Sequence, residues 1–387
     1  MRVLIASNPM FGHFMPLVPL ATALSAGGHE VVVATEPGFL DRVRSHGLDG
    51  VAVGRDLTLD DVLGVLPDIF EVAPEDQDAY ARPRMFVELR ANNVLGDLLA
   101  SVSEWQPDLI IRETGEFASW AVAERLAIPH VTVNVGAGGS AEQWDGWAGP
   151  WFRDLGLRLG LDELTASSLY RYGLVSFEPA GYYDWSATPT AVVFRPAPIA
   201  TGPITDAAIA ALDDRPLIYV TLGTEFYDAD LMRSILEALR GGDWNVVATT
   251  GPGGVPAEVD PRVPDVVVAS WVPHDAIVDR ASLVISHAGA GTIAGCLVRG
   301  VPVVCVPRGA DQFHHANRVE ELGAGLSLGT DSRSPAEIRA AVDEVLGAPR
   351  YRRAAGRVAA DTARLPDVEQ AVAHLEDLVA GLRAGAT

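Results

Sequence analysis

The sequence predicts an α/β protein whose two domains each hold a parallel β-sheet. Short β-branched runs alternate with segments of helical periodicity, which is the pattern of parallel strands joined by covering helices. This alternation restarts at Pro216 after a proline-rich stretch, so a second sheet is expected. The chain has 387 residues, more than one hydrophobic core usually serves, and this length also favours two domains.

The first half of the chain contains the first predicted sheet, with strands expected at residues 3–7, 30–35, 108–111 and 130–135. Residues 17–26 carry apolar side chains at helical spacing and end in Gly27-Gly28, which is a helix stop. The first two strands and this helix therefore form a predicted βαβ unit. The second sheet is expected to contain strands at 217–222, 245–250, 265–269, 283–286 and 302–306.

A proline-rich stretch separates the two predicted sheets. Residues 188–215 contain four prolines, and repeated proline argues against a continuous helix or a central strand. We therefore assign residues 1–195 to an N-terminal domain, 196–215 to a linker and 216–365 to a C-terminal domain.

Composition and charge narrow the class of protein. Hydrophobic residues make up 48% of the chain and charged residues 21%, as in a folded globular protein. The formal net charge of −22 disfavours nucleic acids and anionic membranes as partners. Cys296 and Cys305 lie in apolar runs, so no disulfide framework is expected. The sequence shows neither a signal-peptide pattern nor an apolar run long enough to span a membrane, so we expect a cytoplasmic protein. A homodimer is possible.

The most informative motif is a glycine-rich turn after the strand expected at 283–286. His287 opens the turn, which runs through Gly289 and Gly291 into a helix expected to begin near Thr292. Unpaired backbone N–H groups and the helix dipole make such a turn an anion site, and the imidazole can donate to a phosphate oxygen. Purely structural turns share this pattern. Its place at the carboxyl end of a strand, where open α/β sheets bind ligands, favours phosphate binding.

Three further motifs follow strands of the same predicted sheet. The indole of Trp271 can stack on a nucleobase while the backbone of Val272 reads the base edge, and filling the edge of the sheet is the alternative. Asp311 and Gln312 can bind sugar hydroxyls, and Asp311 can also cap the next helix. Thr224 can reach a diphosphate or a sugar, or serve only as a turn residue.

In the first half, His13 lies between the first strand and its helix, at the carboxyl end of that sheet. Imidazole is the side chain best suited to remove a proton near neutral pH, although a lone histidine in a turn is usually structural. Glu113 follows another strand of the same sheet. A carboxylate behind the imidazole would fix its tautomer and stabilise the imidazolium, which favours a catalytic interpretation.

Aromatic residues gather between positions 143 and 185. They are Trp144, Trp147, Trp151, Phe152, Tyr170, Tyr172, Phe177, Tyr182, Tyr183 and Trp185. Aromatic side chains offer the surface that a flat hydrophobic ligand needs, and packing of a helical insertion is the alternative for most of them.

In combination, these motifs closely resemble those of the bacterial natural-product glycosyltransferases, over nearly the whole chain. The resemblance rests on Gly12-His13 with Pro16, Gly28-His29-Glu30-Val31, Pro107-Asp108-Leu109-Ile110-Ile111 followed by an acid, Thr221-Leu222-Gly223-Thr224, Trp271-Val272-Pro273, the turn from His287 to Thr292, and Pro307 with Asp311-Gln312. It implies the GT-B fold of two facing Rossmann-like domains, with a last helix at 366–387 that crosses back to the N-terminal domain.

The resemblance also implies a chemistry: inverting, metal-independent transfer of a sugar, expected to be a deoxy sugar, from a nucleoside diphosphate to a hydroxyl of a small hydrophobic acceptor. It makes His13 the general base and Glu113 its support, although relatives more often carry Asp there. The implied donor contacts are Thr224, Trp271, Val272, His287, Gly289, Gly291, Thr292, Asp311 and Gln312. The expected acceptor contacts are Phe14, Trp144, Trp147 and Trp151. No cofactor or metal is expected, and a TDP-sugar is favoured over a UDP-sugar.

Several alternatives share parts of this pattern. A nicotinamide dehydrogenase lacks support because no G-x-G-x-x-G opens the first helix. A nucleotide-sugar epimerase of the same two-domain fold is the stronger rival, but it needs no aromatic acceptor pocket. A non-catalytic sugar-nucleotide-binding protein would not need His13. A metal-dependent transferase would need an acidic pair such as Asp228 and Asp230, for which helix capping is the favoured role.

Overall fold

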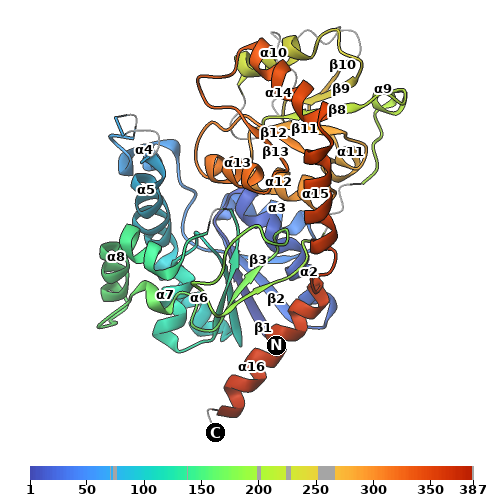
Figure 1. The fold of residues 1–387 in the computed structure, drawn as a ribbon. Helices are drawn as coiled ribbons and strands as arrows, with labels where there is room; N and C mark the ends of the chain where they lie inside the picture. The colour runs from blue at the N-terminus through green and yellow to red at the C-terminus, as the bar shows by residue number, and fades with distance from the viewer. Residues whose placement is uncertain are drawn as a thin grey trace. The chain divides into compact units, whose positions relative to one another are not determined.

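The computed structural model describes residues 1–69, 71–72, 76–136, 138–197, 202–223, 228–251 and 266–385. The chain divides into two compact units (Figure 1). The first unit comprises residues 1–178, 183–197 and 366–387, and the second comprises 179–182 and 198–365. The last helix thus groups with the N-terminal unit, where the sequence placed it. Within the described ranges, none of the helices combines the length and the hydrophobicity that a bilayer crossing requires.

The first unit contains a seven-stranded parallel sheet with the order β3-β2-β1-β4-β5-β6-β7. Its strands are β1 (Arg2–Ala6), β2 (Glu30–Thr35), β3 (Asp49–Ala52), β4 (Leu109–Glu113), β5 (His130–Asn134), β6 (Leu174–Ser176) and β7 (Ala191–Val193). The strand order reverses between β1 and β4, which pair directly, Val3 with Leu109. In open α/β sheets, ligands bind beyond the carboxyl ends of the strands at such a reversal.

Helices cover this sheet. They are α1 (Phe11–Phe14), α2 (Val18–Ala26), α3 (Leu40–Ser45), α4 (Leu59–Val65), α5 (Gln77–Arg82), the π-helix η3 (Pro83–Ala91), α6 (Asn92–Trp105), α7 (Ala118–Leu126), α8 (Ala141–Arg158) and α16 (Val368–Gly385), with 3₁₀ turns η1 (Met15–Leu17), η2 (Pro37–Phe39) and η4 (Ala166–Ser168). Buried side chains of α6, α7 and α8, such as Leu98, Trp120 and Phe152, share one hydrophobic core with the sheet.

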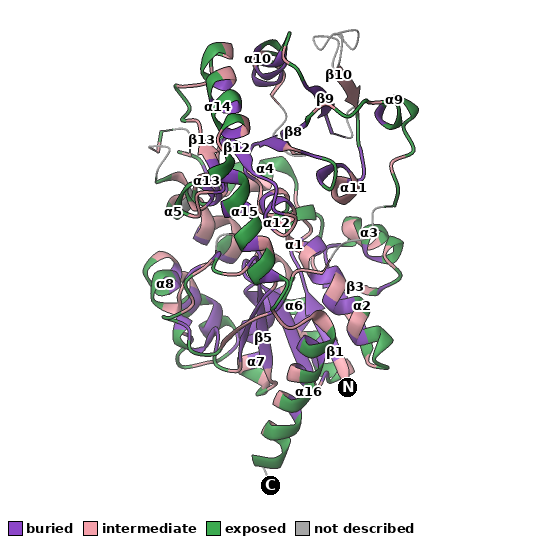
Figure 2. Ribbon diagram, turned by 45° about the vertical axis from the view of Figure 1, so that its right-hand side comes forward, coloured by how far each residue is buried: buried purple, intermediate pink, exposed green. Residues whose placement is uncertain are grey.

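The second unit contains a six-stranded sheet with the order β10-β9-β8-β11-β12-β13. Its strands are β8 (Leu217–Thr221), β9 (Asn245–Thr249), β10 (Val266–Ala269), β11 (Leu283–Ser286), β12 (Val303–Cys305) and β13 (Gly325–Ser327). Its helices are α9 (Ala207–Ala210), α10 (Ala229–Leu239), α11 (His274–Val278), α12 (Ala290–Leu297), α13 (Gln312–Glu321), α14 (Pro335–Gly347) and α15 (Pro349–Thr362). The central strands β4, β5, β8, β9, β11 and β12 are buried along their whole length, whereas β3, β7 and β10 are not (Figure 2). The order reverses between β8 and β11, which again marks the expected ligand edge.

The predicted strands are confirmed to within about two residues, but the sequence missed β3, β6, β7 and β13. Each of these has only three or four residues. The edge strand β7 lies inside the proline-rich stretch that we expected to lack a central strand, and edge positions tolerate neighbouring prolines. Helix α12 begins at Ala290, two residues before the predicted start.

Helix α16 packs beside α2 in the first unit (Figure 1). His29 Nε2 lies 3.1 Å from Glu376 Oε1 of α16, and Arg383 contacts Asp108. The backbone N–H of Arg195 donates to the carbonyl oxygen of Pro366 at 2.7 Å. These contacts fix the last helix to the N-terminal sheet, as the GT-B fold implies.

Candidate active site

His13 and Glu113 meet at the strand reversal of the first sheet. His13 lies on the short helix α1 that follows β1, and Glu113 is the last residue of β4. His13 Nδ1 lies 3.0 Å from Glu113 Oε1, as the sequence predicted. The carboxylate is fully buried, whereas the imidazole is 23% exposed. A ligand can therefore reach the histidine but not the acid behind it.

The surroundings of Glu113 favour its ionised form. Burial is the largest influence and raises its pKa, but attraction to His13 and hydrogen bonds from His13, Gly115 and Asn8 outweigh it, so the pKa lies below its usual value. The Asn8 side-chain amide donates to Oε1 at 2.6 Å, and the Gly115 N–H donates to Oε2. Glu113 is therefore a fixed carboxylate beside the imidazole.

Close packing holds the imidazole in place. A Cβ at Gly115 would lie 3.2 Å from His13 Cε1 and 3.3 Å from Glu113 Oε2. The absence of a side chain at Gly115 therefore leaves room for the His13–Glu113 pair. On another side, the Phe86 ring lies with its centroid 5.4 Å from that of His13. The fully buried Arg112 supports the loop after β4 by donating from Nη1 to the carbonyl oxygens of Glu113 and Glu116 at 3.1 and 2.6 Å.

This arrangement can perform general-base chemistry. When Nδ1–H of His13 donates to Glu113, the other ring nitrogen, Nε2, carries the lone pair. Nε2 can then accept a proton from a hydroxyl group, and the carboxylate stabilises the imidazolium that forms.

The glycine-rich turn of the second unit encloses His287. A Cβ at Gly223 would lie 2.7 Å from His287 Cε1, and a Cβ at Gly289 would lie 2.6 Å from Nε2. Burial is the largest influence and lowers the pKa of His287, although a hydrogen bond to the backbone of Thr221 and the charge of Asp311 oppose it. Burial thus favours the neutral imidazole, whose single N–H can donate either to the carbonyl oxygen of Thr221 or to a bound ligand, but not to both at once.

Helix α12 begins within this turn. Gly289 is its N-cap and supplies no capping side chain, and Gly291 and Thr292 lie in the first turn. Ser286 Oγ accepts the N–H of Ala288 at 3.1 Å, which stabilises the left-handed backbone at Ala288, where φ is 67°. The first N–H groups of α12 remain uncapped by side chains, which is the arrangement of an anion site.

The other predicted donor residues differ in exposure. Trp271 follows β10 and is 58% exposed, so its indole is available for stacking, whereas the side chain of Val272 is buried. Thr224 lies outside the described residues. Asp228 caps α10 by accepting the N–H groups of Asp230 and Leu231 at 3.0 Å, which confirms capping for Asp228. The Asp230 side chain instead lies 2.9 Å from Arg233 Nη1.

Asp311 and Gln312 follow β12 but make different contacts. Gln312 Oε1 accepts the backbone N–H of Arg308 at 2.8 Å and thereby shapes its own loop. The Asp311 side chain makes no cap of α13 and instead lies 3.1 Å from His315 Nε2. His315 Nδ1 in turn lies 2.8 Å from the Tyr182 hydroxyl. A hydrogen-bonded chain from Tyr182 thus orients the carboxylate that we expect to bind sugar.

The structure corrects part of the predicted acceptor surface. Phe14 and Trp144 are each only 1% exposed and belong to the packed interior, so neither side chain presents a surface to a ligand. Trp147 and Trp151 are partly buried, and the guanidinium groups of Arg82 and Arg84 lie 5.4 and 5.5 Å from their ring centroids. Packing of the insertion thus explains Trp144, and acceptor contact stays a prediction for Trp147 and Trp151.

Sequence reasoning missed the residues that hold the predicted ones. They are Asn8, Phe86, Arg112, Gly115 and His315, together with Tyr182, which the sequence placed only among the aromatic residues. Asn8 and Gly115 could have been found, because both lie just past the ends of adjacent strands. Nothing in the sequence relates Phe86 to His13, since a π-helix and tertiary packing bring them together.

Comparison with known proteins decides the family. Residues 22–155 and 233–378 match the N-terminal and C-terminal domains of the family described as Erythromycin biosynthesis protein CIII-like. The aklavinone 7-beta-L-rhodosaminyltransferase of Streptomyces galilaeus is 30% identical over 99% of this chain and 97% of its own length. The chain belongs to this family of bacterial natural-product glycosyltransferases. The glycosyltransferase is also 31% identical to the L-demethylnoviosyl transferase of Streptomyces niveus, over 95% of each chain.

Solved structures show the same fold. The glycosyltransferase superposes on the spinosyn forosaminyltransferase SpnP with a TM-score of 0.81 at 23% identity, covering 98% of this chain and 99% of that one. The calicheamicin glycosyltransferase CalG4 gives a TM-score of 0.81 at 24% identity, covering 98% of both chains. The two parallel-sheet units of this glycosyltransferase therefore have the GT-B fold.

Proposed function

We propose that this glycosyltransferase moves a deoxy sugar from a TDP-sugar to a hydroxyl group of a small hydrophobic natural-product acceptor, with inversion and without a metal ion. The observation that carries the proposal is the partly exposed His13 imidazole, 3.0 Å from a buried carboxylate at the strand reversal of its sheet. A base oriented in this way can deprotonate an acceptor hydroxyl.

The second unit supports a nucleoside diphosphate as donor. The uncapped start of α12 offers N–H donors to the diphosphate, and the exposed Trp271 offers an aromatic face to the base. His287 can add its N–H when that group donates to the ligand in place of the Thr221 carbonyl oxygen. The TDP-daunosamine transferase DnrS of Streptomyces peucetius, 27% identical over 100% of this chain, carries TDP in its name. That relationship favours thymidine over uridine.

The proposed reaction is a single displacement. His13 Nε2 takes the proton of the acceptor hydroxyl as its oxygen attacks the anomeric carbon from the face opposite the diphosphate. The bond to the diphosphate breaks, and its growing negative charge is stabilised by the N–H groups of α12 and by His287. Because these donors meet the charge of the leaving group, the reaction as proposed needs no metal.

The relatives reported above are transferases, and the epimerase alternative finds no support among them. Cytoplasmic location and homodimerisation stay expectations from the sequence. Cell fractionation and light scattering of the purified protein test them.

The test of the proposal starts with native mass spectrometry of the protein with a panel of TDP-sugars and UDP-sugars. A donor that binds is then incubated with hydrophobic hydroxyl acceptors in the presence of EDTA. We expect tighter binding of TDP-sugars and a product whose anomeric configuration, read by NMR, is inverted. A retained configuration, or activity restored only by added Mg²⁺, contradicts the proposal.

A further inference from the structure

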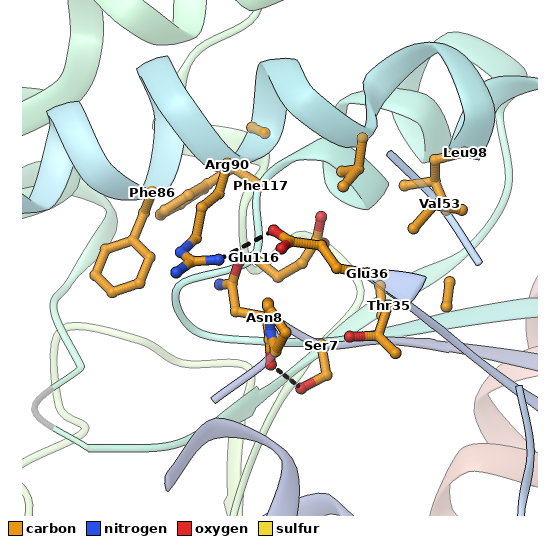
Figure 3. Close-up of a pocket in the computed structure, with 15 residues that line it drawn as sticks. Ser7, Asn8, Thr35, Glu36, Val53, Phe86, Arg90, Leu98, Glu116 and Phe117 are labelled. Carbon is orange, nitrogen blue, oxygen red and sulfur yellow. Dashed lines mark hydrogen bonds and ion pairs between the residues drawn. The ribbon is translucent and has the colours of Figure 1, made fainter. Parts of the chain in front are cut away.

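A small cavity lies beside the His13–Glu113 pair in the first unit (Figure 3). The loops after β1 and β4, the end of β2, the π-helix η3 and the start of α6 form its walls. Its volume is about 20 Å³, which is room for one water-sized group. Nothing in the donor chemistry or in the proposed role of His13 uses this cavity.

The cavity has a polar floor between apolar walls. Arg90 Nη1 pairs with Glu36 Oε1 at 3.0 Å, and both side chains are largely buried (Figure 3). Thr35 is only 2% exposed, and its hydroxyl has no hydrogen-bond partner among the described residues. Arg90 Nε also lacks a partner among them. A buried hydroxyl and a buried guanidinium N–H thus retain unused hydrogen-bonding capacity beside a cavity.

The cavity adjoins the proposed base through shared residues. Asn8 lines the cavity and also donates to Glu113 Oε1 at 2.6 Å. Phe86 lines it and packs on His13. Phe86 and Arg90 both belong to η3, and π-helical turns are rare and are frequent at functional sites. Asn8 and Phe86 thus line the cavity and also contact the His13–Glu113 pair.

We infer that this cavity binds a second oxygen of the acceptor, a neutral hydroxyl or carbonyl group, through hydrogen bonds with Thr35 and Arg90. Arg90 supplies an N–H donor, and the Thr35 hydroxyl donates or accepts. The charges of Arg90 and Glu36 offset each other, and Glu116, which also lines the cavity, adds a second carboxyl group, so the lining disfavours a carboxylate as the bound group. This inference rests on the proposed function and narrows the acceptor to molecules that carry at least two oxygen substituents.

The test compares two acceptor analogues, 2,6-dihydroxynaphthalene and 6-methyl-2-naphthol, which differ by a hydroxyl in place of a methyl group. Their affinities are measured by calorimetry, and their ratio is taken for each variant. We expect the ratio in favour of the diol to fall about three- to tenfold in Thr35→Val, the effect of one hydrogen bond. Arg90→Met combined with Glu36→Gln removes both charges together and should lower the ratio in the same way.

The matched control is Thr132→Val on β5. Thr132 is also buried in this sheet, but its hydroxyl donates to the Leu169 carbonyl oxygen and it does not line the cavity. The control should keep the wild-type ratio, and thermal melting checks that each variant is folded. A ratio unchanged in Thr35→Val, or no binding of either naphthol to the wild type at millimolar concentration, overturns the inference. The calorimetric test of the cavity needs neither a sugar donor nor turnover. A failure of the proposed sugar transfer would therefore be seen separately, in the assays with nucleotide sugars.

Discussion

At the residue scale, the proposed chemistry depends most directly on His13. His13→Ala should lower the rate about a hundred- to ten-thousandfold, or ~3–5 kcal/mol of transition-state stabilisation, because general-base catalysis typically contributes that much. Glu113→Gln should cost less, since it removes charge support but not the base. Steady-state rates measure both effects, with melting curves as the control for folding. Near-normal turnover by a folded His13→Ala protein on a hydroxyl acceptor excludes the mechanism.

Tyr182 gives a second prediction at this scale, which depends on Asp311 binding the donor sugar. Tyr182→Phe removes the hydroxyl that lies 2.8 Å from His315 Nδ1, so His315 holds Asp311 less firmly. TDP-glucose should then bind about three- to tenfold more weakly, whereas TDP, which has no sugar at that position, should bind as before. Calorimetry with both ligands measures the difference. Equal losses for the two ligands would show that Tyr182 has only a structural role.

The sequence allowed His13 and Glu113 to be paired because both follow strands of one parallel sheet, and adjacent strands end at the same edge. It did not allow Tyr182 and His315 to be paired, because 133 positions separate them and the contact depends on the packing of a segment without regular structure. The same limit applies to Trp144. Aromatic composition is the same for a ligand surface and for a core, and only packing distinguishes the two.

At the element scale, the turn between β11 and α12 depends on the absence of a side chain at Gly289. Its φ of −64° suits any residue, so space and not backbone conformation requires glycine. A Cβ there would lie 2.6 Å from His287 Nε2. Gly289→Ala should therefore displace the imidazole and weaken TDP binding at least about tenfold.

Calorimetric titration with TDP measures this loss. Gly347→Ala at the end of α14 is the matched control, because a Cβ there meets nothing within 4 Å. Unchanged TDP affinity in Gly289→Ala would show that His287 does not contact the diphosphate.

Glu178, near the ends of β5 and β6, gives a pH-dependent prediction. Burial raises its pKa to about 8, although hydrogen bonds from Ser176 and Asn134 oppose this. Between the ordinary pKa of 4.5 and about 8, the folded protein keeps a proton that the unfolded chain releases. The free energy of unfolding should therefore fall as the pH rises through this range, by at most about 1.4 kcal/mol per pH unit from this group.

Glu178→Gln should remove this slope and raise stability most near pH 8. Urea unfolding at several pH values between about 5 and 8 measures it, with the exposed Glu104→Gln on α6 as control. The same slope in wild type and in Glu178→Gln would mean that Glu178 is already ionised in the folded protein.

Prediction from the sequence succeeded best for the longer strands, whose β-branched runs of four to six residues remain buried in both sheets. It failed for β13, whose sequence Gly-Leu-Ser has no strand preference of its own. A Cβ at Gly325 would lie 1.8 Å from the Val303 carbonyl oxygen, so close approach to β12 selects glycine there. Tertiary pairing, and not local propensity, creates such edge strands.

At the scale of the whole molecule, the net charge of −22 opposes the binding of an anionic donor. The local donors around His287 and α12 must overcome a repulsion that acts over the Debye length, about 30 Å at 0.01 M salt and about 8 Å at 0.15 M. Raising the salt concentration across this range should screen the repulsion and accelerate TDP association, on the order of tenfold. Stopped-flow tryptophan fluorescence measures the rate, and thymidine, which carries no charge, should show no comparable change. An association rate that falls with added salt would mean that local positive charge, and not the acidic surface, governs the approach of the donor.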